Sequence, residues 1–248
     1  MSDMEELCDL LFEFSSTERM NIMKSLHEER LRLSHLSKNL DITVTEASRH
    51  LQRLSDIQLI DKDADGAFGP TPYGELALSL LSSLDFVSRN KEYFLEHDMS
   101  GLPDGLIGRI SELSLAWLNT DVVRVLAHVN VMFQEAEEYI WVMSYAHSLP
   151  STIPIVEERL EKGVTLRRIF PEEIIPPTGE AETISGPCRT LPKVDFRIMM
   201  TEKEAMCSLP SIDGRIDYTS FIGKDPKFHK WCTDLYLYYW EKAEPAVV

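Results

Sequence analysis

Apolar residues in the first third of the chain recur with the 3.6-residue period of an α-helix. The stripes predict an amphipathic helix or turn over residues 7–14, a helix capped by Ser16, a short helix over 33–40 and a longer one over 43–58. Two extended runs then flank Asp65-Gly66, which predicts a hairpin. Thr71-Pro72 opens a further helix, because threonine can cap and proline suits the first helical position. After the helix or turn over 7–14, the predicted order is helix, helix, helix, hairpin, helix.

The helix predicted over 43–58 has two distinct faces. Thr43 is a good N-cap, and Glu46 stands three residues later in capping-box position. The apolar stripe that would face the core consists of Ala47, Leu51, Leu54 and Ile57. The opposite, solvent-facing sides carry Thr45, Glu46, Ser48, Arg49, Gln52 and Arg53. This polar face has the width and chemistry to enter a groove.

The remainder of the chain changes from helices to alternating strands and helices. A helical pattern over 79–96 breaks at 97–103, and helices are predicted over 103–118 and 122–138. A strand over 138–144, a helix over 153–162 and a strand over 164–170 predict a parallel βαβ unit. Later strands are expected at 193–200, 205–209 and 218–222, with a closing helix over 226–243. We therefore predict an α+β fold with domains at 1–89 and 90–248, and a lid or mobile loop over 171–192.

The charge of the chain bears on its partners. A net charge of −16 opposes nucleic-acid binding, and residues 1–88 alone carry 8 basic against 16 acidic side chains. Between residues 30 and 53, however, only Asp41 and Glu46 oppose five basic residues. These are Arg30, Arg32, Lys38, Arg49 and Arg53. Basic charge is thus concentrated where a nucleic-acid contact would need it.

Several other classes of protein are disfavoured. No apolar run reaches the roughly 20 residues of a membrane helix, and no signal peptide is recognisable, so we expect a cytoplasmic protein. The four cysteines are scattered and are expected to be reduced thiols without a metal. A phospholipase-D-type His-x-Lys pair, a phosphate-binding glycine loop, a Gly-x-Ser-x-Gly elbow and His-Glu-x-x-His are missing. We expect no catalytic residues and no cofactor.

The N-terminal motifs resemble a known family. The segments 36–37, 43–54, 59–60 and 71–74 together resemble the winged helix-turn-helix of archaeal ArsR- and MarR-like transcription regulators. In that family the helix matching residues 45–55 lies in the major groove of double-stranded DNA, beside a hairpin wing. The resemblance implies base contacts from Thr45, Ser48 and Arg49, with Thr43, His50 and Arg53 nearer phosphates. Arg49 is the best candidate for reading guanine, against the alternative of a merely solvated arginine. The wing carries Lys62, but three aspartates make its contact with phosphate doubtful.

The C-terminal motifs resemble a second family. The segments 97–103, 109–113, 163–167, 208–217 and 231–240 resemble the middle domain of archaeal methanogenesis regulators of the Fil type. The strand at 163–167 also resembles the effector domain of sugar-responsive archaeal regulators, which have a phospholipase-D-like sheet. Members of the Fil family join such a domain to a winged helix. The resemblance implies an α/β domain that senses an effector.

Candidate effector contacts follow from the predicted strands. Open α/β sheets bind ligands at the carboxyl ends of their strands, where Tyr145, His147 and Arg168 are expected. Arg167 and Arg197 lie within strand patterns, where a buried arginine needs a partner. Each arginine could bind an anionic ligand or pair with an acidic side chain. Tyr145 and His147 could equally be core or surface residues without a ligand.

These patterns favour one function over two others. We expect a homodimeric, effector-controlled transcription regulator whose dimer forms through helices around 75–118. The first alternative is a protein-interaction module that has lost DNA binding, which the acidic N-terminal segment favours. The second is an enzyme acting on a small phosphorylated or acyl ligand, which the missing nucleophile motifs disfavour. The sequence leaves the effector, the operator and the sign of regulation open.

Overall fold

The computed structural model describes residues 3–146, 150–174, 186–215 and 217–246. The chain forms two compact units, Met1–Leu84 and Asp85–Val248. The division into two domains after residue 89 stays a prediction. Among the described residues, no helix is long and apolar enough to span a membrane.

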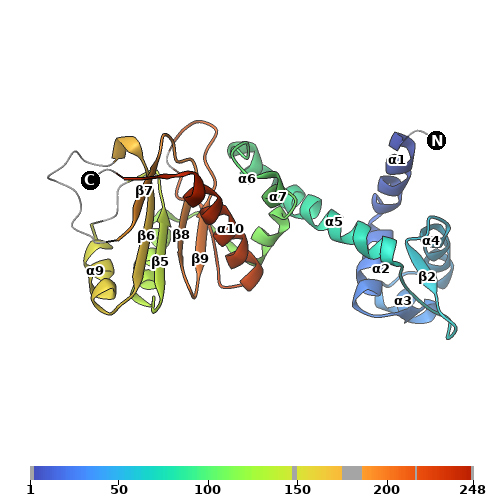
Figure 1. Ribbon diagram of the computed structural model, residues 1–248. Helices are drawn as coiled ribbons and strands as arrows, with labels where there is room; N and C mark the ends of the chain where they lie inside the picture. Colours follow the sequence, from blue (N-terminus) through green and yellow to red (C-terminus); the bar gives the residue numbers. More distant parts are fainter. Residues whose placement is uncertain (1–2, 147–149, 175–185, 216, 247–248) are drawn as a thin grey trace. The chain divides into compact units, whose positions relative to one another are not determined.

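The first unit combines helices with a small antiparallel sheet (Figure 1). Its helices are α1 (Asp3–Phe14), α2 (Thr17–Glu28), α3 (Leu33–Asn39), α4 (Val44–Asp56) and the first part of α5 (Pro72–Arg89). Its strands are β1 (Leu31–Arg32), β2 (Ile60–Lys62) and β3 (Ala67–Pro70), in the sheet order β1-β3-β2. The predicted hairpin and the helix after it are present, and four helices precede the hairpin, because the stretch predicted as a helix or turn over 7–14 is the helix α1. The two-residue strand β1 is too short to leave a pattern, so the sequence did not reveal it.

Local sequence signals account for these helices. The Ser16 hydroxyl accepts a hydrogen bond from the Arg19 amide at 3.4 Å and caps α2. Thr43 and Glu46 form the predicted capping box at the start of α4. Gly66 turns the β2–β3 hairpin with φ 83°, a conformation that favours glycine. The core beneath contains apolar side chains of every helix, among them Phe14, Ile22, Leu36, Leu51 and Ala77.

The second unit is built on one mixed sheet. Its strands are β4 (Trp117–Asn119), β5 (Tyr139–Met143), β6 (Thr165–Pro171), β7 (Cys188–Leu191), β8 (Arg197–Thr201), β9 (Ala205–Ser208), β10 (Ser220–Gly223) and β11 (Glu244–Pro245). They lie in the order β11-β7-β6-β5-β8-β9-β10-β4. The parallel pairing of β5 with β6 confirms the predicted βαβ unit. The pairs from β5 through β8, β9 and β10 to β4 are antiparallel.

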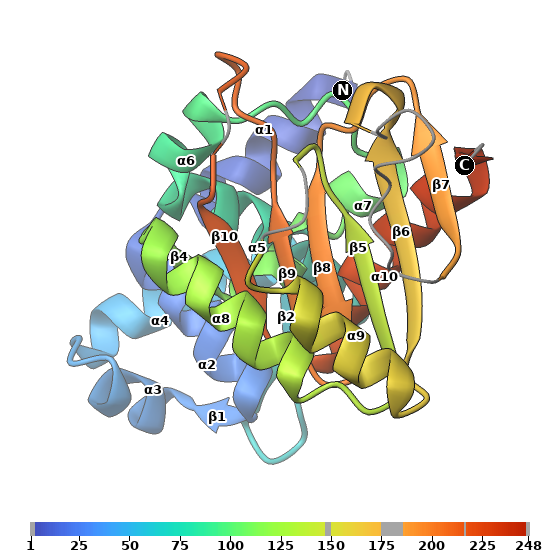
Figure 2. The same cartoon turned by 90° about the vertical axis from the view of Figure 1, so that its left-hand side faces the viewer.

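Helices cover both faces of this sheet. They are α6 (Lys91–Glu96), α7 (Asp104–Ile107), η1 (Ile110–Leu115), α8 (Val122–Gln134), α9 (Ile153–Glu161), η2 (Glu172–Ile174) and α10 (Pro226–Lys242). Helices α8 and α9 cross one face, and α10 packs on the other (Figure 2). Successive strand residues alternate between the two cores: Ile140 and Val142 face α8 and α9, whereas Met143 joins the α10 side.

Two predicted elements were wrong. The helix expected over 103–118 is instead the short α7, the 3-10 helix η1 and strand β4. Gly105 and Gly108 lower helix propensity there, and Trp117 pairs with Ile222 of β10. The loop expected over 171–192 contains strand β7, which pairs in parallel with β6. Residues 175–185 lie outside the described residues, so the idea of a lid stays a prediction.

Candidate nucleic-acid interface and buried arginine pocket

The exposed face of α4 gathers most of the residues predicted to contact DNA. Thr43, Thr45, Ser48 and Arg49 are exposed at its start and along its first turns. Arg49 forms no hydrogen bond or close ion pair within the described residues. The Thr43 hydroxyl donates to Glu46 at 2.7 Å, so the capping box already holds it. Thr45, Ser48 and Arg49 are therefore the most available of the predicted contact residues on this face.

The other two predicted contact residues of α4, His50 and Arg53, are less available for DNA. His50 is only 8% exposed, and burial, followed by the charges of Arg49 and Arg19, lowers its pKa. Arg53 donates to the Glu13 carboxylate from its Nε at 3.1 Å and from its Nη2. His50 thus lies mainly in the core, contrary to the predicted phosphate contact. Arg53 has an acidic partner that phosphate would have to displace.

Glu13 is a buried carboxylate that joins three helices. Its side chain is 9% exposed and lies 2.9 Å from the Arg19 Nε of α2. The hydrogen bond from Arg53 of α4, with the charges of Arg19 and Arg53, holds the pKa of Glu13 below its ordinary value despite burial. Removing either partner of such a buried pair leaves an uncompensated charge. This cluster fixes α4 against α1 and α2.

The β2–β3 hairpin is acidic, and Arg30, which precedes it in the chain, neutralises part of its charge. Arg30 pairs with Asp61 and Asp63 at 2.5 and 3.2 Å. The predicted contact Lys62 is exposed, with its Nζ 5.2 Å from the centre of the Phe68 ring. Arg30 and Arg53 are therefore engaged with acids. Three other cations between residues 30 and 53 are exposed and form no such pair in the described residues: Arg32, Lys38 and Arg49.

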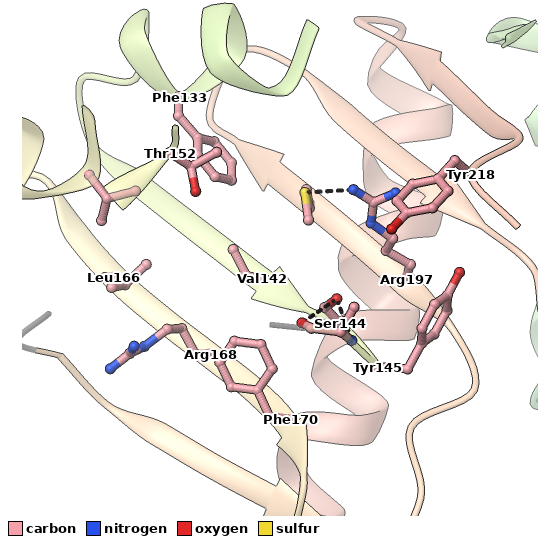
Figure 3. Close-up of a pocket in the computed structure, with 13 residues that line it drawn as sticks. Phe133, Val142, Ser144, Tyr145, Thr152, Leu166, Arg168, Phe170, Arg197 and Tyr218 are labelled. Atoms are coloured by element: carbon pink, nitrogen blue, oxygen red, sulfur yellow. Dashed lines mark hydrogen bonds between the residues drawn. The ribbon is translucent and has the colours of Figure 1, made fainter. Parts of the chain in front are cut away.

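A narrow pocket opens at the carboxyl ends of β5 and β6 (Figure 3). The enclosed cavity measures about 40 Å³, and the empty space totals about 620 Å³ when the open mouth is included. The enclosed volume suits a few waters, and a larger ligand would extend into the mouth. Three predicted effector residues line it: Tyr145, Arg168 and Arg197. Its apolar wall consists of Phe133, Val142, Val156, Leu166, Phe170 and Met199.

Hydrogen bonds connect the rim of the pocket to helix α6. The Tyr145 hydroxyl donates to the Asp217 carbonyl oxygen at 2.8 Å, and burial raises its pKa to about 12. The Asp217 carboxylate lies 3.0 Å from Nε2 of His97, the C-cap of α6. Burial opposes the charge of Asp217, but bonds from Thr219 and His97 outweigh it and lower the pKa. Pocket and helix thus share one polar chain.

Of the other two predicted effector residues, one lies away from this pocket and one is outside the described residues. Arg167 lies on the other face of the sheet, with its guanidinium 4.9 Å from the Trp141 ring centre and 5.3 Å from that of Trp240. This stacking explains why a half-buried strand arginine needs no ligand, and it corrects the predicted grouping with Arg168. His147 lies outside the described residues. Sequence reasoning missed Tyr218 and Thr152, since neither stands in a local motif and only tertiary folding brings them to the pocket.

Comparisons with known proteins add limited information. No protein-family profile matches the chain. No curated protein matches it. The chain is similar to the archaeal chromatin protein TrmBL2, whose structure shows a novel mode of DNA binding, at 13% identity over 99% of this chain and 100% of that one, with a TM-score of 0.46.

Two further solved structures cover parts of the chain. The phospholipase D family member Nuc from Salmonella typhimurium matches at 14% identity over 50% of this chain and 91% of its own, with a TM-score of 0.39. Reduced HlyU from Vibrio cholerae matches at 24% identity over 34% of this chain and 97% of its own, with a TM-score of 0.29. At TM-scores below 0.5, we draw no conclusion on fold or function from these likenesses.

Proposed function

We propose that the chain is a dimeric, DNA-binding transcription regulator of the winged-helix type. The observation that carries this proposal is the exposed polar face of α4, on which Ser48 and Arg49 are open to solvent. The capping box and the ion pair of Arg53 with Glu13 fix the position of this helix. A rigid helix of this kind can lie in the major groove with its first turns against base edges. The β2–β3 hairpin corresponds to the wing, and no catalytic step is part of the proposal.

The distribution of charge is compatible with this role. Three exposed cations lie on or beside the helices α3 and α4. Arg32 lies just before α3, Lys38 within α3 and Arg49 on α4. Exposed ion pairs such as Arg30 with Asp61 contribute little, so phosphate can replace the acid at small cost. The acidic hairpin limits contact to few phosphates. We therefore expect specificity to depend more on α4 than on the wing.

A second copy of the chain is proposed to cover the apolar stripe of α5. Tyr73, Leu76, Leu80 and Leu84 follow at intervals of three and four residues, which places them on one face of the helix. They are 48%, 60%, 67% and 60% exposed. Burying a leucine contributes about 1.5–3 kcal/mol, so three from each copy can offset the about 4 kcal/mol or more that association costs. Such pairing presents two α4 helices to two half-sites.

Effector control is proposed to act through the pocket of the second unit. The chain of hydrogen bonds from Tyr145 through Asp217 to His97 ends at α6, which follows α5 after Asn90. A ligand that moves Tyr145 would disturb this chain. Typical coupling energies of about 1–3 kcal/mol are enough to change operator affinity by about 5- to 150-fold.

Salt dependence tests the DNA-binding proposal without knowledge of the operator. If about three cations of each copy contact phosphates, the logarithm of the affinity for a labelled random-sequence duplex should fall against log salt with a slope of about −5. This is about a 10³-fold loss between about 50 and 200 mM salt, measured by fluorescence anisotropy. Lys38→Ala should reduce the slope by about 1 per copy, whereas Arg124→Ala on α8 should leave it unchanged.

The competing candidate is a protein-interaction module. The imbalance of 8 basic against 16 acidic residues in the segment 1–88, together with the acidic hairpin, favours it. A slope near zero would refute the DNA proposal and support this candidate, whereas a steep slope that Lys38→Ala leaves unchanged would exclude Lys38 as a phosphate contact.

A further inference from the structure

Arg197 at the start of β8 is a buried cation without an acidic partner in the described part of the chain. The residue is 3% exposed, and its Nη1 atom has no hydrogen-bond partner there. Its Nη2 atom meets only the Met199 sulfur, at 3.9 Å, and the guanidinium lies 4.9 Å from the Tyr218 ring centre. Burying a charge without a hydrogen-bonded counter-charge is strongly unfavourable. A guanidinium kept buried at this cost is expected to bind a partner.

Arg167 shows what a satisfied strand arginine looks like in the same sheet. Its guanidinium stacks on the rings of Trp141 and Trp240 and remains partly exposed to water. The Arg197 guanidinium stacks on one tyrosine ring and is almost fully shielded from solvent. The difference lies in the surroundings, since Arg197 lines the pocket of Figure 3 together with Arg168. The unmet hydrogen-bonding capacity therefore belongs to a ligand site.

We infer that this pocket binds a small monocarboxylate with an apolar body, whose carboxylate pairs with the Arg197 guanidinium. The planar fork of an arginine matches the two oxygens of a carboxylate. The wall formed by α8, α9, β5, β6 and β8 is hydrocarbon, including Phe133, Val156 and Leu166. This combination of apolar wall and few polar groups is typical of sites for amphiphilic small molecules.

Size and charge narrow the ligand class further. An enclosed cavity of only about 40 Å³ excludes a nucleotide or a sugar chain. The net charge of −16 disfavours multiply charged anions, which the field of the whole protein repels. A small carboxylate satisfies both limits when its apolar body extends from the enclosed space into the open mouth of the pocket. The inference rests on the proposed function only for the ligand's role as an effector, and the binding itself is independent of DNA.

Thermal melting of the full-length protein tests the site without DNA, so failure here is distinct from failure of the DNA proposal. Benzoate and hexanoate, each at about 10 mM, should raise the melting temperature by at least about 3 °C. Benzamide and hexanamide, which share the shape and lack the charge, should not. Inorganic phosphate should not either. A rise with the amides, a rise with phosphate alone, or no rise with either carboxylate would overturn the inference.

Variants distinguish a ligand-binding arginine from a structural one. Arg197→Met should abolish the carboxylate response and raise the melting temperature of the unliganded protein by about 3–8 °C, because it removes an unpaired buried charge. Arg197→Lys, which keeps the charge without the fork, should weaken the response. Arg167→Met on the other face should keep it. A lower unliganded melting temperature for Arg197→Met, with the carboxylate response retained, would show that Arg197 is structural.

Discussion

Replacing Arg49 with alanine is expected to lower the affinity of the dimer for its operator by about 30-fold to 10⁴-fold. A guanidinium that bonds both acceptors of a guanine contributes about 1–3 kcal/mol, and a dimer makes this contact twice. Arg49 is exposed and has no close partner in the described residues, so the substitution costs the fold little. Titration of a labelled operator by fluorescence anisotropy gives the affinity, and a set of single-base operator variants gives the specificity.

Two further variants separate base reading from charge. Arg49→Lys should retain affinity for random DNA but lose discrimination at one base pair of each half-site, since lysine lacks the planar fork. Arg124→Ala removes the same charge from an exposed site in the second unit and should change the affinity by less than about twofold. Equal losses for Arg49→Ala and Arg124→Ala would mean that charge alone matters. The proposed base contact would then be wrong.

Replacing Leu76 and Leu80 together with aspartate is expected to convert the dimer into a monomer and to weaken operator binding by about 100-fold or more. The two side chains are 60% and 67% exposed, so the change should leave the first unit folded. In the dimer it would place four carboxylates in an apolar contact, which is strongly unfavourable. A monomer binds one half-site and loses the gain that comes from linking two.

Light scattering at about micromolar concentration measures the first effect. The unmodified protein should have twice the 28.4 kDa mass of one chain, and the variant the mass of one. Val123→Asp supplies the matched control, because Val123 is 75% exposed on α8 and lies outside the stripe. A variant that stays dimeric, or an unmodified protein that is already monomeric, would exclude the α5 stripe as the dimer contact.

Much of the fold could be predicted from the sequence because local signals agree with tertiary structure. The capping box of Thr43 and Glu46, the apolar stripe through Leu51 and Leu54, and the Gly66 turn each specify one element within a few residues. The parallel pairing of β5 with β6 followed from a strand, a helix and a strand of ordinary length. The strands β1, β4 and β11 were missed because two or three residues carry no period, and β7 was missed because it lies in a stretch rich in proline and glycine.

The site was less predictable because burial and pairing are tertiary properties. Arg167 and Arg168 are neighbours in sequence but face opposite sides of the sheet, where Arg167 meets tryptophans and Arg168 meets the pocket. The family resemblance that implied a phosphate contact for His50 could not show that this side chain is buried. Nor could it show that Glu13, forty residues earlier, pairs with Arg53. The structure alone distinguishes Arg49 from these two neighbours.

Selection of genomic DNA fragments by the full-length protein at about physiological salt tests the central claim most directly, because it requires no prior operator. Sequencing of the bound fragments should yield one shared palindrome whose half-sites are centred about one DNA turn, roughly 10 base pairs, apart. Arg49→Ala should recover no such site. Fragments that match the input library, or a site recovered equally by Arg49→Ala, would contradict the account of α4 as the helix that reads DNA.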